Sequence, residues 1–180
     1  MLDLSYLRPA VPAEVLKSEL TKERFIRYTS KLRNEIYIVN VHNAPNVVQE
    51  IGRLRELTFA SSDGGTGNSV DLDELDFSET PYQQLIVWNP EEAEIVGGYR
   101  FIDGAVIAEQ GDWKHDLSMG HYFNFSEKFL TEYLPYSIEL GRSWVQPKYQ
   151  PAVDPRKGMF ALDNIWDGLG AICLTYKHMR

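Results

Sequence analysis

The sequence predicts one mixed domain of the α/β or α+β class, with a central sheet flanked by helices. Residues 35–41 alternate in polarity and are rich in β-branched side chains, which is typical of a strand. Two further apolar runs, 84–89 and 95–102, are separated by a short polar segment, as in an antiparallel hairpin. Residues 47–60 and 159–177 instead place apolar side chains at helical spacing.

Composition agrees with a folded, soluble domain. The 180 residues are 43% hydrophobic and 24% charged, so a chain of this length needs neither disulfides nor a metal to form a core. A net charge of −8 argues against a nucleic-acid-binding protein. The single Cys173 favours a reducing compartment, and neither a secretory signal nor a membrane span is recognisable. We expect a cytoplasmic protein, with peripheral contact at the inner membrane left open.

The acidity is concentrated in the middle of the chain. Residues 61–112 hold 12 acidic side chains and one basic one, whereas the rest of the chain is net positive. A solvated acidic loop region is the simplest explanation. An acidic partner is still compatible with a basic patch built from Arg24, Arg27, Lys31, Arg33, Arg156 and Lys157.

In the first half, residues 1–34 are expected to form a helical extension to a main domain over 35–180. Asn46 is a suitable N-cap for the helix over 47–60. The glycine-rich segment 61–69 is predicted to be a loop, serving either as a substrate loop or as a connector, because it lacks the lysine of a P-loop. The buried face of the helix is formed by Val47, Ile51, Leu54 and Thr58.

In the second half, residues 125–134 are predicted to form a short helix with Phe125, Phe129 and Tyr133 directed inward. Residues 137–145 are predicted to be a central strand that ends before Pro147. The apolar stripe of the last helix, 159–177, includes Cys173, which we expect to be a packed core thiol.

Charged residues within apolar strands are the most informative positions. Arg100 lies in the second hairpin strand, and Glu139 and Arg142 lie in the strand over 137–145. Such groups are costly to bury unless they are paired. A structural ion pair between adjacent strands explains them as well as a catalytic site does.

Four motifs in order, LRELTF, DLDELD, GGYRFI and ELGRSWV, resemble the acyl-carrier-protein-dependent branch of the GNAT acyltransferase superfamily. That branch contains the acyl-homoserine-lactone synthases and the ornithine and glycine lipid N-acyltransferases. Longer stretches within residues 11–180 look like the hemolysin-like, lipid-forming N-acyltransferases of Bacteroidetes-type bacteria. The resemblance implies a GNAT-like, mostly antiparallel sheet flanked by helices, incomplete at the C-terminus.

The resemblance also implies an enzyme of aminolipid biosynthesis. It would move a 3-hydroxylated fatty acyl group from acyl carrier protein to the α-amine of glycine or ornithine. The donor would be a phosphopantetheine thioester, with no permanently bound cofactor and no metal. The open alternatives are a lactone-synthase-like enzyme, a coenzyme A-dependent N-acetyltransferase, and a non-catalytic lipid- or protein-binding scaffold.

The family's site residues match seven positions of this chain. The expected catalytic residues are Glu139, as the base that takes the proton of the amine, together with Arg100 and Arg142, which suit the acceptor's carboxylate. Gly141 would allow the strand to open and expose a backbone N–H for the oxyanion. The expected substrate-binding residues are Arg55, Phe59, Asp73 and Asp76, although capping a helix is a simpler role for the two aspartates.

The start of the last helix departs from the usual GNAT pattern. Many members bind pyrophosphate with Q/R-x-x-G-x-G/A, where this chain has PRKGMF at 155–160. We expect Arg156, Lys157 and Gly158 to meet the single phosphate of the carrier's arm at the helix N-terminus. A basic surface turn is the alternative.

Overall fold

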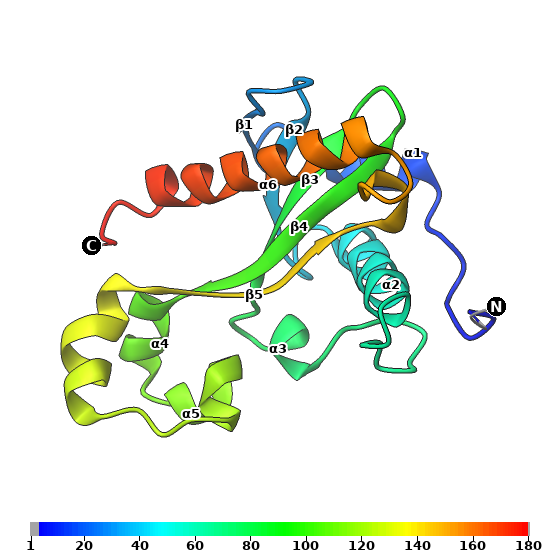
Figure 1. Cartoon of the computed structure of the whole chain (residues 1–180). Coiled ribbons are helices and arrows are strands. Elements are labelled where there is room, and N and C mark those ends of the chain that lie inside the picture. The colour runs from blue at the N-terminus through cyan, green and yellow to red at the C-terminus, as the bar shows by residue number, and fades with distance from the viewer. Residues whose placement is uncertain (1–3, 180) are drawn as a thin grey trace.

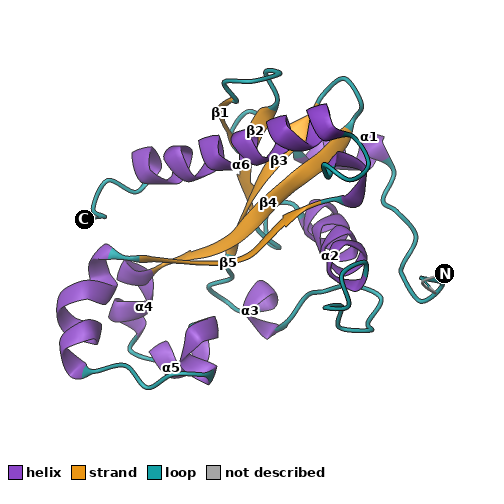
Figure 2. Ribbon diagram, viewed as in Figure 1, coloured by secondary structure: helices purple, strands orange, loops and turns teal. Residues whose placement is uncertain are grey.

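The computed structural model describes residues 4–179 and has a five-stranded sheet between two helical layers (Figures 1 and 2). The strand order is β1-β2-β3-β4-β5, and each neighbouring pair is antiparallel. The strands are β1 (Phe25–Tyr28), β2 (Glu35–Val39), β3 (Gln83–Asn89), β4 (Glu94–Asp103) and β5 (Ile138–Val145). The main helices are α1 (Ala13–Glu19), α2 (Pro45–Ala60), α3 (Glu74–Phe77), α4 (Gly104–Gln110), α5 (Trp113–Asp116) and α6 (Pro155–Thr175).

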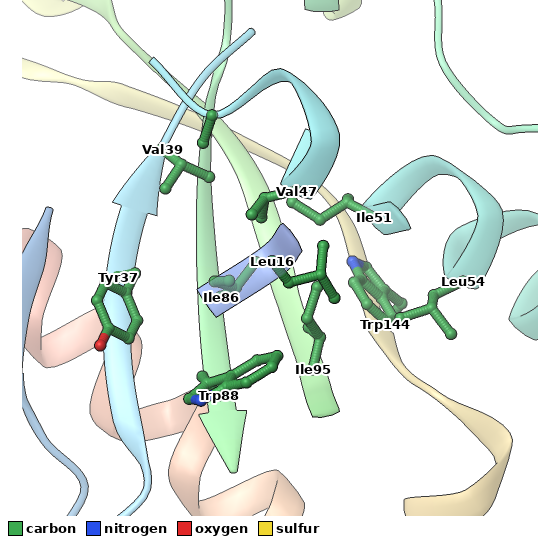
Figure 3. Packing of buried hydrophobic residues seen from close by; sticks show 11 residues of the cluster. Leu16, Tyr37, Val39, Val47, Ile51, Leu54, Ile86, Trp88, Ile95 and Trp144 are labelled. Carbon is green, nitrogen blue, oxygen red and sulfur yellow. The ribbon is translucent and has the colours of Figure 1, made fainter. Parts of the chain in front are cut away.

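Alternating side chains of the central strands divide the core into two layers. Ile86 and Trp88 on β3 pack against α1 and α2, where Leu16 and Ile51 meet them (Figure 3). Leu85 and Val87 on the same strand face the opposite way and pack against α6. This period of two fixes which face of β3 each helix covers.

A third cluster lies beyond the far ends of β4 and β5, where short helices form an extension (Figure 1). It includes Ile102, Ile107, Leu117 and Leu134. The extension contains α4, α5, the 3₁₀ turns Ser118–His121 and Leu134–Tyr136, and the π turn Phe129–Tyr133.

The predicted hairpin is confirmed, and its two glycines allow a close strand approach. A Cβ on Gly98 would lie 2.1 Å from the carbonyl oxygen of Leu85, and one on Gly97 would lie 2.3 Å from that of Trp144. No side chain fits at such distances, so β4 can be paired on both edges only with glycine at these positions.

The buried face predicted for the first long helix is confirmed, but the predicted cap is wrong. Ala44 is the N-cap residue and Pro45 is the first helical residue. Glu19 of α1 accepts hydrogen bonds from the backbone N–H groups of Asn46, at 3.2 Å, and Val47, at 2.9 Å. A carboxylate from another helix thus replaces the expected local cap.

Several boundaries and environments in the second half differ from expectation. The strand over 137–145 forms as β5, but it is the last strand in the order and not a central one. Tyr133 is exposed rather than directed inward, because the chain there forms a π turn. The last helix begins at Pro155, four residues earlier than predicted.

The last helix is apolar on two sides, and only one of them is covered. Ile165 and Ile172 face the sheet, whereas Leu162 and Trp166 are exposed. The expectation of a packed thiol is wrong, because Cys173 is exposed. Within residues 4–179, no helix combines the length and apolar character that crossing a bilayer requires.

The first 34 residues contribute to the sheet as well as carrying a helix. Strand β1 pairs with β2, and Tyr28 lies opposite Glu35. The expected strand over 35–41 is shorter in the structure and ends at Val39.

Candidate functional site

Three arginines from separate elements and three aspartates from one segment form one group, here called the arginine–aspartate cluster. Arg55 lies on α2, Arg100 on β4 and Arg142 on β5. Arg55 is 0% exposed and Arg100 is 2% exposed, so both guanidinium groups lie within the protein. The aspartates all come from the segment 71–76 and are Asp71, Asp73 and Asp76.

Local backbone interactions bring the acidic segment to the helix. The N–H of Asp71 donates to the carbonyl of Gly52 at 2.9 Å, and a Cβ on Gly52 would lie 2.6 Å from Leu72. Asp73 is the N-cap of α3 and forms a capping box with Asp76. The capping role considered for these two aspartates is therefore observed, and the same side chains also join the cluster.

The ion pairs link the cluster into a continuous network. Arg100 Nη1 lies 2.6 Å from Asp73 Oδ1 and 3.2 Å from Asp76 Oδ2. Arg55 Nε lies 3.1 Å from Asp71 Oδ2, and its Nη1 lies 3.7 Å from Asp76 Oδ1. Arg142 Nε lies 3.2 Å from Asp71 Oδ2. Each aspartate thus meets two arginines, Arg142 reaching Asp73 at 3.9 Å.

A β-bulge brings Arg142 to this network. Gly98 pairs with Trp144 and Arg100 pairs with Gly141, which leaves Arg142 in an irregular stretch of β5 with a φ of 48°. Glu139 and Arg142 are three residues apart, so their side chains would point to opposite faces of a regular strand. The extra residue of the bulge instead lets Arg142 reach the face on which Arg100 lies. The opening expected at Gly141 is therefore present one residue later.

Burial and opposite charges compete in setting the ionisation of the cluster. Burial raises the pKa of Asp76 above its ordinary value, against the effect of Arg55 and Arg100. Burial also acts to raise the pKa of Asp73, but the hydrogen bond and charge of Arg100 outweigh it and lower that pKa. For Arg100, burial acts to lower the pKa, and the charges of both aspartates raise it above the ordinary value.

Glu139 lies next to the cluster and is joined to it through Tyr82. Tyr82 donates a hydrogen bond from its hydroxyl to Glu139 Oε1 at 3.0 Å. The guanidinium of Arg100 stacks over the Tyr82 ring, 4.8 Å from its centroid. Burial raises the pKa of Glu139, while the Tyr82 hydrogen bond acts to lower it. A carboxylate with a raised pKa can accept a proton from an amine at neutral pH.

Comparison with known proteins agrees with this geometry. Residues 54–154, more than half of the chain, match the acetyltransferase (GNAT) domain family. The chain belongs to the GNAT acetyltransferase family. The matched range includes the arginine–aspartate cluster from Arg55 to Arg142, and the antiparallel sheet flanked by helices is consistent with the GNAT fold.

Two curated relatives are similar over nearly the whole chain. A glycine N(alpha)-acyltransferase of Phocaeicola vulgatus is 52% identical over 170 residues, which are 94% of this chain and 52% of the relative. A glycine N(alpha)-acyltransferase of Bacteroides thetaiotaomicron is 51% identical over 170 residues, 94% of this chain and 50% of the relative. The chain thus spans about half the length of these GNAT relatives. No solved structure gives a significant match.

An apolar hollow lies beside the bulge of this GNAT domain. Its volume is about 510 Å³, and it lies between the end of α2, strand β5 and the first half of α6. Phe59, predicted to bind substrate, lines the hollow instead of joining the cluster. Other lining side chains are Tyr99, Ser143, Trp144, Leu162 and Trp166.

The residues predicted to bind phosphate have partners in the structure. The carboxylate of Asp154 accepts the N–H groups of Arg156 and Lys157, so it occupies the first turn of α6. Lys157 also pairs with Glu92 at 2.5 Å, and its hydrogen bond helps to lower the pKa of Glu92 to about 2. A phosphate at this helix N-terminus would have to displace Asp154. Gly158 lines the hollow.

The structure brings five of the predicted site residues, Arg55, Asp73, Asp76, Arg100 and Arg142, into one cluster and adds three partners that were not predicted. Asp71 belongs to the acidic motif, yet its role in joining Arg55 to Arg142 depends on the fold. Gln84 donates to Asp76 at 2.8 Å, and its amide within an apolar strand was the available signal. Tyr82 had no such signal, because a tyrosine before a strand is ordinarily a core residue.

Proposed function

We propose that this GNAT domain carries an N-acyltransferase site that moves a fatty acyl group from acyl carrier protein to the α-amine of glycine, as a step of aminolipid formation. The observation that carries the proposal is Glu139, a half-buried carboxylate with a raised pKa beside Arg100 and the bulge of β5. The names of the two relatives support glycine as the acceptor.

The reaction needs a base and a fixed donor. The neutral amine attacks the thioester carbonyl, the new C–N bond forms, and Glu139 takes the proton directly or through a water. The C–S bond then breaks, and the carrier's sulfur leaves as a thiolate that takes the proton from Glu139, which restores the carboxylate. The proposed oxyanion donor is an N–H in the irregular stretch around Arg142 and Ser143, and the position of these residues between the registered pairs of β5 supports that role.

Arg142 is the better candidate for holding the carboxylate of glycine. The side chain of Arg100 is 2% exposed and pairs with two aspartates, whereas that of Arg142 is 39% exposed. Arg142 can therefore contact a small acid without losing its bond to Asp71. Arg100 then acts by holding Asp73 and Asp76 in place.

The apolar lining of the hollow supports an acyl thioester as the donor substrate. Phe59, Trp144 and Leu162 give it an apolar wall next to the bulge, where the thioester would lie. A carrier-protein donor fits a chain whose net negative charge is concentrated in its middle, and Arg156, which lines a neighbouring hollow, offers a positive charge for the phosphate.

Peripheral contact with a membrane belongs to the same proposal. Met119, Tyr122 and Phe123 are exposed in the extension, and the N–H of Met119 points to Glu139 Oε2 at 3.5 Å. Aromatic side chains of this kind suit a membrane interface, into which an acylated product would pass. We expect anionic vesicles to co-sediment wild type more than a Tyr122→Ser/Phe123→Ser variant, and equal sedimentation would contradict the contact.

The experiment offers the protein 3-hydroxypalmitoyl carrier protein and one acceptor at a time, with product detection by mass spectrometry. We expect N-acylglycine as the main product. Ornithine tests the other amino-acid acceptor, S-adenosylmethionine tests a lactone-synthase-like reaction, and acetyl-coenzyme A in place of the carrier protein tests an N-acetyltransferase. Absence of an N-acyl product from every pair would contradict the proposal, and acyl-carrier binding without turnover would favour a binding scaffold.

Replacing the base tests the mechanism. Glu139→Gln should lower kcat about 10²- to 10⁴-fold with an unchanged circular dichroism spectrum. Glu109→Gln, at an exposed glutamate of α4, is the matched control and should retain activity. Equal turnover by Glu139→Gln would remove Glu139 from the mechanism.

A further inference from the structure

Tyr82 is a buried tyrosine whose hydroxyl makes two directed hydrogen bonds. The residue directly precedes β3 and is 1% exposed. The backbone N–H of Ser118 donates to the Tyr82 hydroxyl oxygen at 2.9 Å. Because that oxygen already accepts a hydrogen bond from Ser118, the hydroxyl hydrogen is directed to the other neighbour, Glu139 Oε1, at 3.0 Å.

The ring of Tyr82 is fixed from other elements. The backbone N–H of Tyr82 donates to the carbonyl of Leu75 in α3 at 3.0 Å, and the guanidinium of Arg100 lies over the face of the Tyr82 ring. The side chain is therefore held by α3, β4 and the 3₁₀ turn at Ser118. Both the position and the hydrogen-bond direction of the phenol are set before any substrate arrives.

We propose that Tyr82 is a positioning residue, whose hydroxyl fixes the carboxylate of Glu139 in the orientation needed to take a proton from the acceptor amine. This inference rests on the proposed function, in which Glu139 is the base. Tyr82 itself contacts no reacting atom. Its ring packs against Arg100 of the arginine–aspartate cluster and its hydroxyl donates to Glu139, so the cluster and Glu139 are held in a fixed relation to each other.

Electrostatics supports this role. Burial and the charge of Glu139 raise the pKa of Tyr82, so the phenol stays protonated and remains a donor. The groups acting on Glu139 are Tyr82, the charge of Arg100, and the N–H groups of Ser118 and Met119. Burial raises the pKa of Glu139, and these groups oppose burial. A hydrogen bond to a charged group shifts a pKa by about one unit, so loss of the hydroxyl should raise the pKa of Glu139 by about that much.

The first test is Tyr82→Phe, which keeps the ring under Arg100 and removes only the hydroxyl. We expect the rising limb of the kcat–pH profile to move up by about one pH unit, with the KM for glycine unchanged. Tyr37→Phe is the matched control, because Tyr37 is also buried and donates to a glutamate, Glu35, at 2.8 Å. An unshifted profile for Tyr82→Phe would overturn the proposal.

A direct measurement separates this inference from the proposed function. Carbon-detected NMR titration gives the pKa of the Glu139 carboxyl without any turnover, and Glu139→Gln assigns the resonance. We expect the pKa of Glu139 to be higher in Tyr82→Phe than in wild type, and an equal pKa would refute the proposed positioning of Glu139 by the Tyr82 hydroxyl. Absence of N-acylglycine from wild type would contradict only the proposed function.

Ser118→Pro offers a second variant should Tyr82→Phe fold poorly. Ser118 is the first residue of its 3₁₀ turn, and Leu117 before it has φ −102° and ψ 130°, which suits a residue preceding proline. The substitution removes the N–H that orients the Tyr82 hydroxyl. Because the same N–H also acts on Glu139 directly, we expect the pKa of Glu139 to rise in this variant by both routes, and no rise would argue against the proposed orientation.

Discussion

Substitution of Asp76 by asparagine should destabilise the protein strongly. Asp76 is 1% exposed and accepts hydrogen bonds from Gln84, at 2.8 Å, and from Arg100, at 3.2 Å. Asparagine has nearly the same shape but carries no charge. The cluster would change from three arginines and three aspartates to three arginines and two aspartates, and Arg55 would keep only Asp71.

The magnitude follows from leaving a buried charge without its partner. Removing one partner of a buried ion pair costs about 3–5 kcal/mol. The loss affects Arg55 most, because its buried Nη1 and Nη2 have no hydrogen-bond partner among the described residues and depend on the nearby negative charge of Asp76. With a urea m-value of about 2 kcal/mol/M, a loss of about 4 kcal/mol lowers the unfolding midpoint by about 2 M.

Urea unfolding followed by tryptophan fluorescence measures this change. Asp112→Asn is the control, because Asp112 forms an exposed pair with His115, and its loss should alter the free energy of unfolding by less than about 0.5 kcal/mol. Adding Arg55→Met to Asp76→Asn restores the charge balance and should recover part of the stability. A loss below about 1 kcal/mol for Asp76→Asn, or no recovery in the double variant, would refute the reasoning.

Three further predictions concern the scaffold. Gly98→Ala should force β4 from β3, because its Cβ would lie 2.1 Å from a carbonyl oxygen; we expect at least about 2 kcal/mol lost in urea unfolding, and wild-type stability would contradict the close approach. Glu56 accepts hydrogen bonds from Thr66 and Gly67 that outweigh burial and lower its pKa, so its stabilisation is complete above about pH 4.5 and is lost as the pH falls through the lower folded pKa. Glu56→Gln should therefore increase proteolysis of the loop 61–69 at pH 7, with little further change on acidification. Glu19→Ala should cost about 1 kcal/mol in thermal unfolding by removing the cap of α2, and an unchanged midpoint would show that water replaces it.

The features that were predictable from sequence depend on local periodicity. The hairpin of β3 and β4 shows as two apolar runs separated by a short polar segment, and the buried face of α2 repeats at helical spacing, so both predictions were correct. Arg100, Glu139 and Arg142 attracted attention because charges within apolar strands need partners. The motif order then indicated that these charges lie together.

The features that could not be predicted depend on contacts between distant segments. The cap of α2 comes from Glu19, 28 residues before Val47, and no local pattern reports it. Cys173 follows the apolar spacing of α6, but spacing does not show which of two apolar sides the sheet covers. Gly141 indicated an opening in β5, but the positive φ occurs one residue later, at an arginine held by Asp71 and Asp73, and only the fold shows those partners.

The arginine–aspartate cluster also constrains how such a protein can evolve. Its six charges join α2, the acidic segment, β4 and β5, so the same bonds that shape the site hold these elements together. A single charge change there removes stability before it can alter specificity. Leu162 and Trp166 in the wall of the hollow are exposed, so they can be substituted at little cost in stability. Under the proposed function, changes of acyl preference are therefore expected to arise along α6, whereas residues of the cluster are expected to change only in pairs that keep its charges balanced.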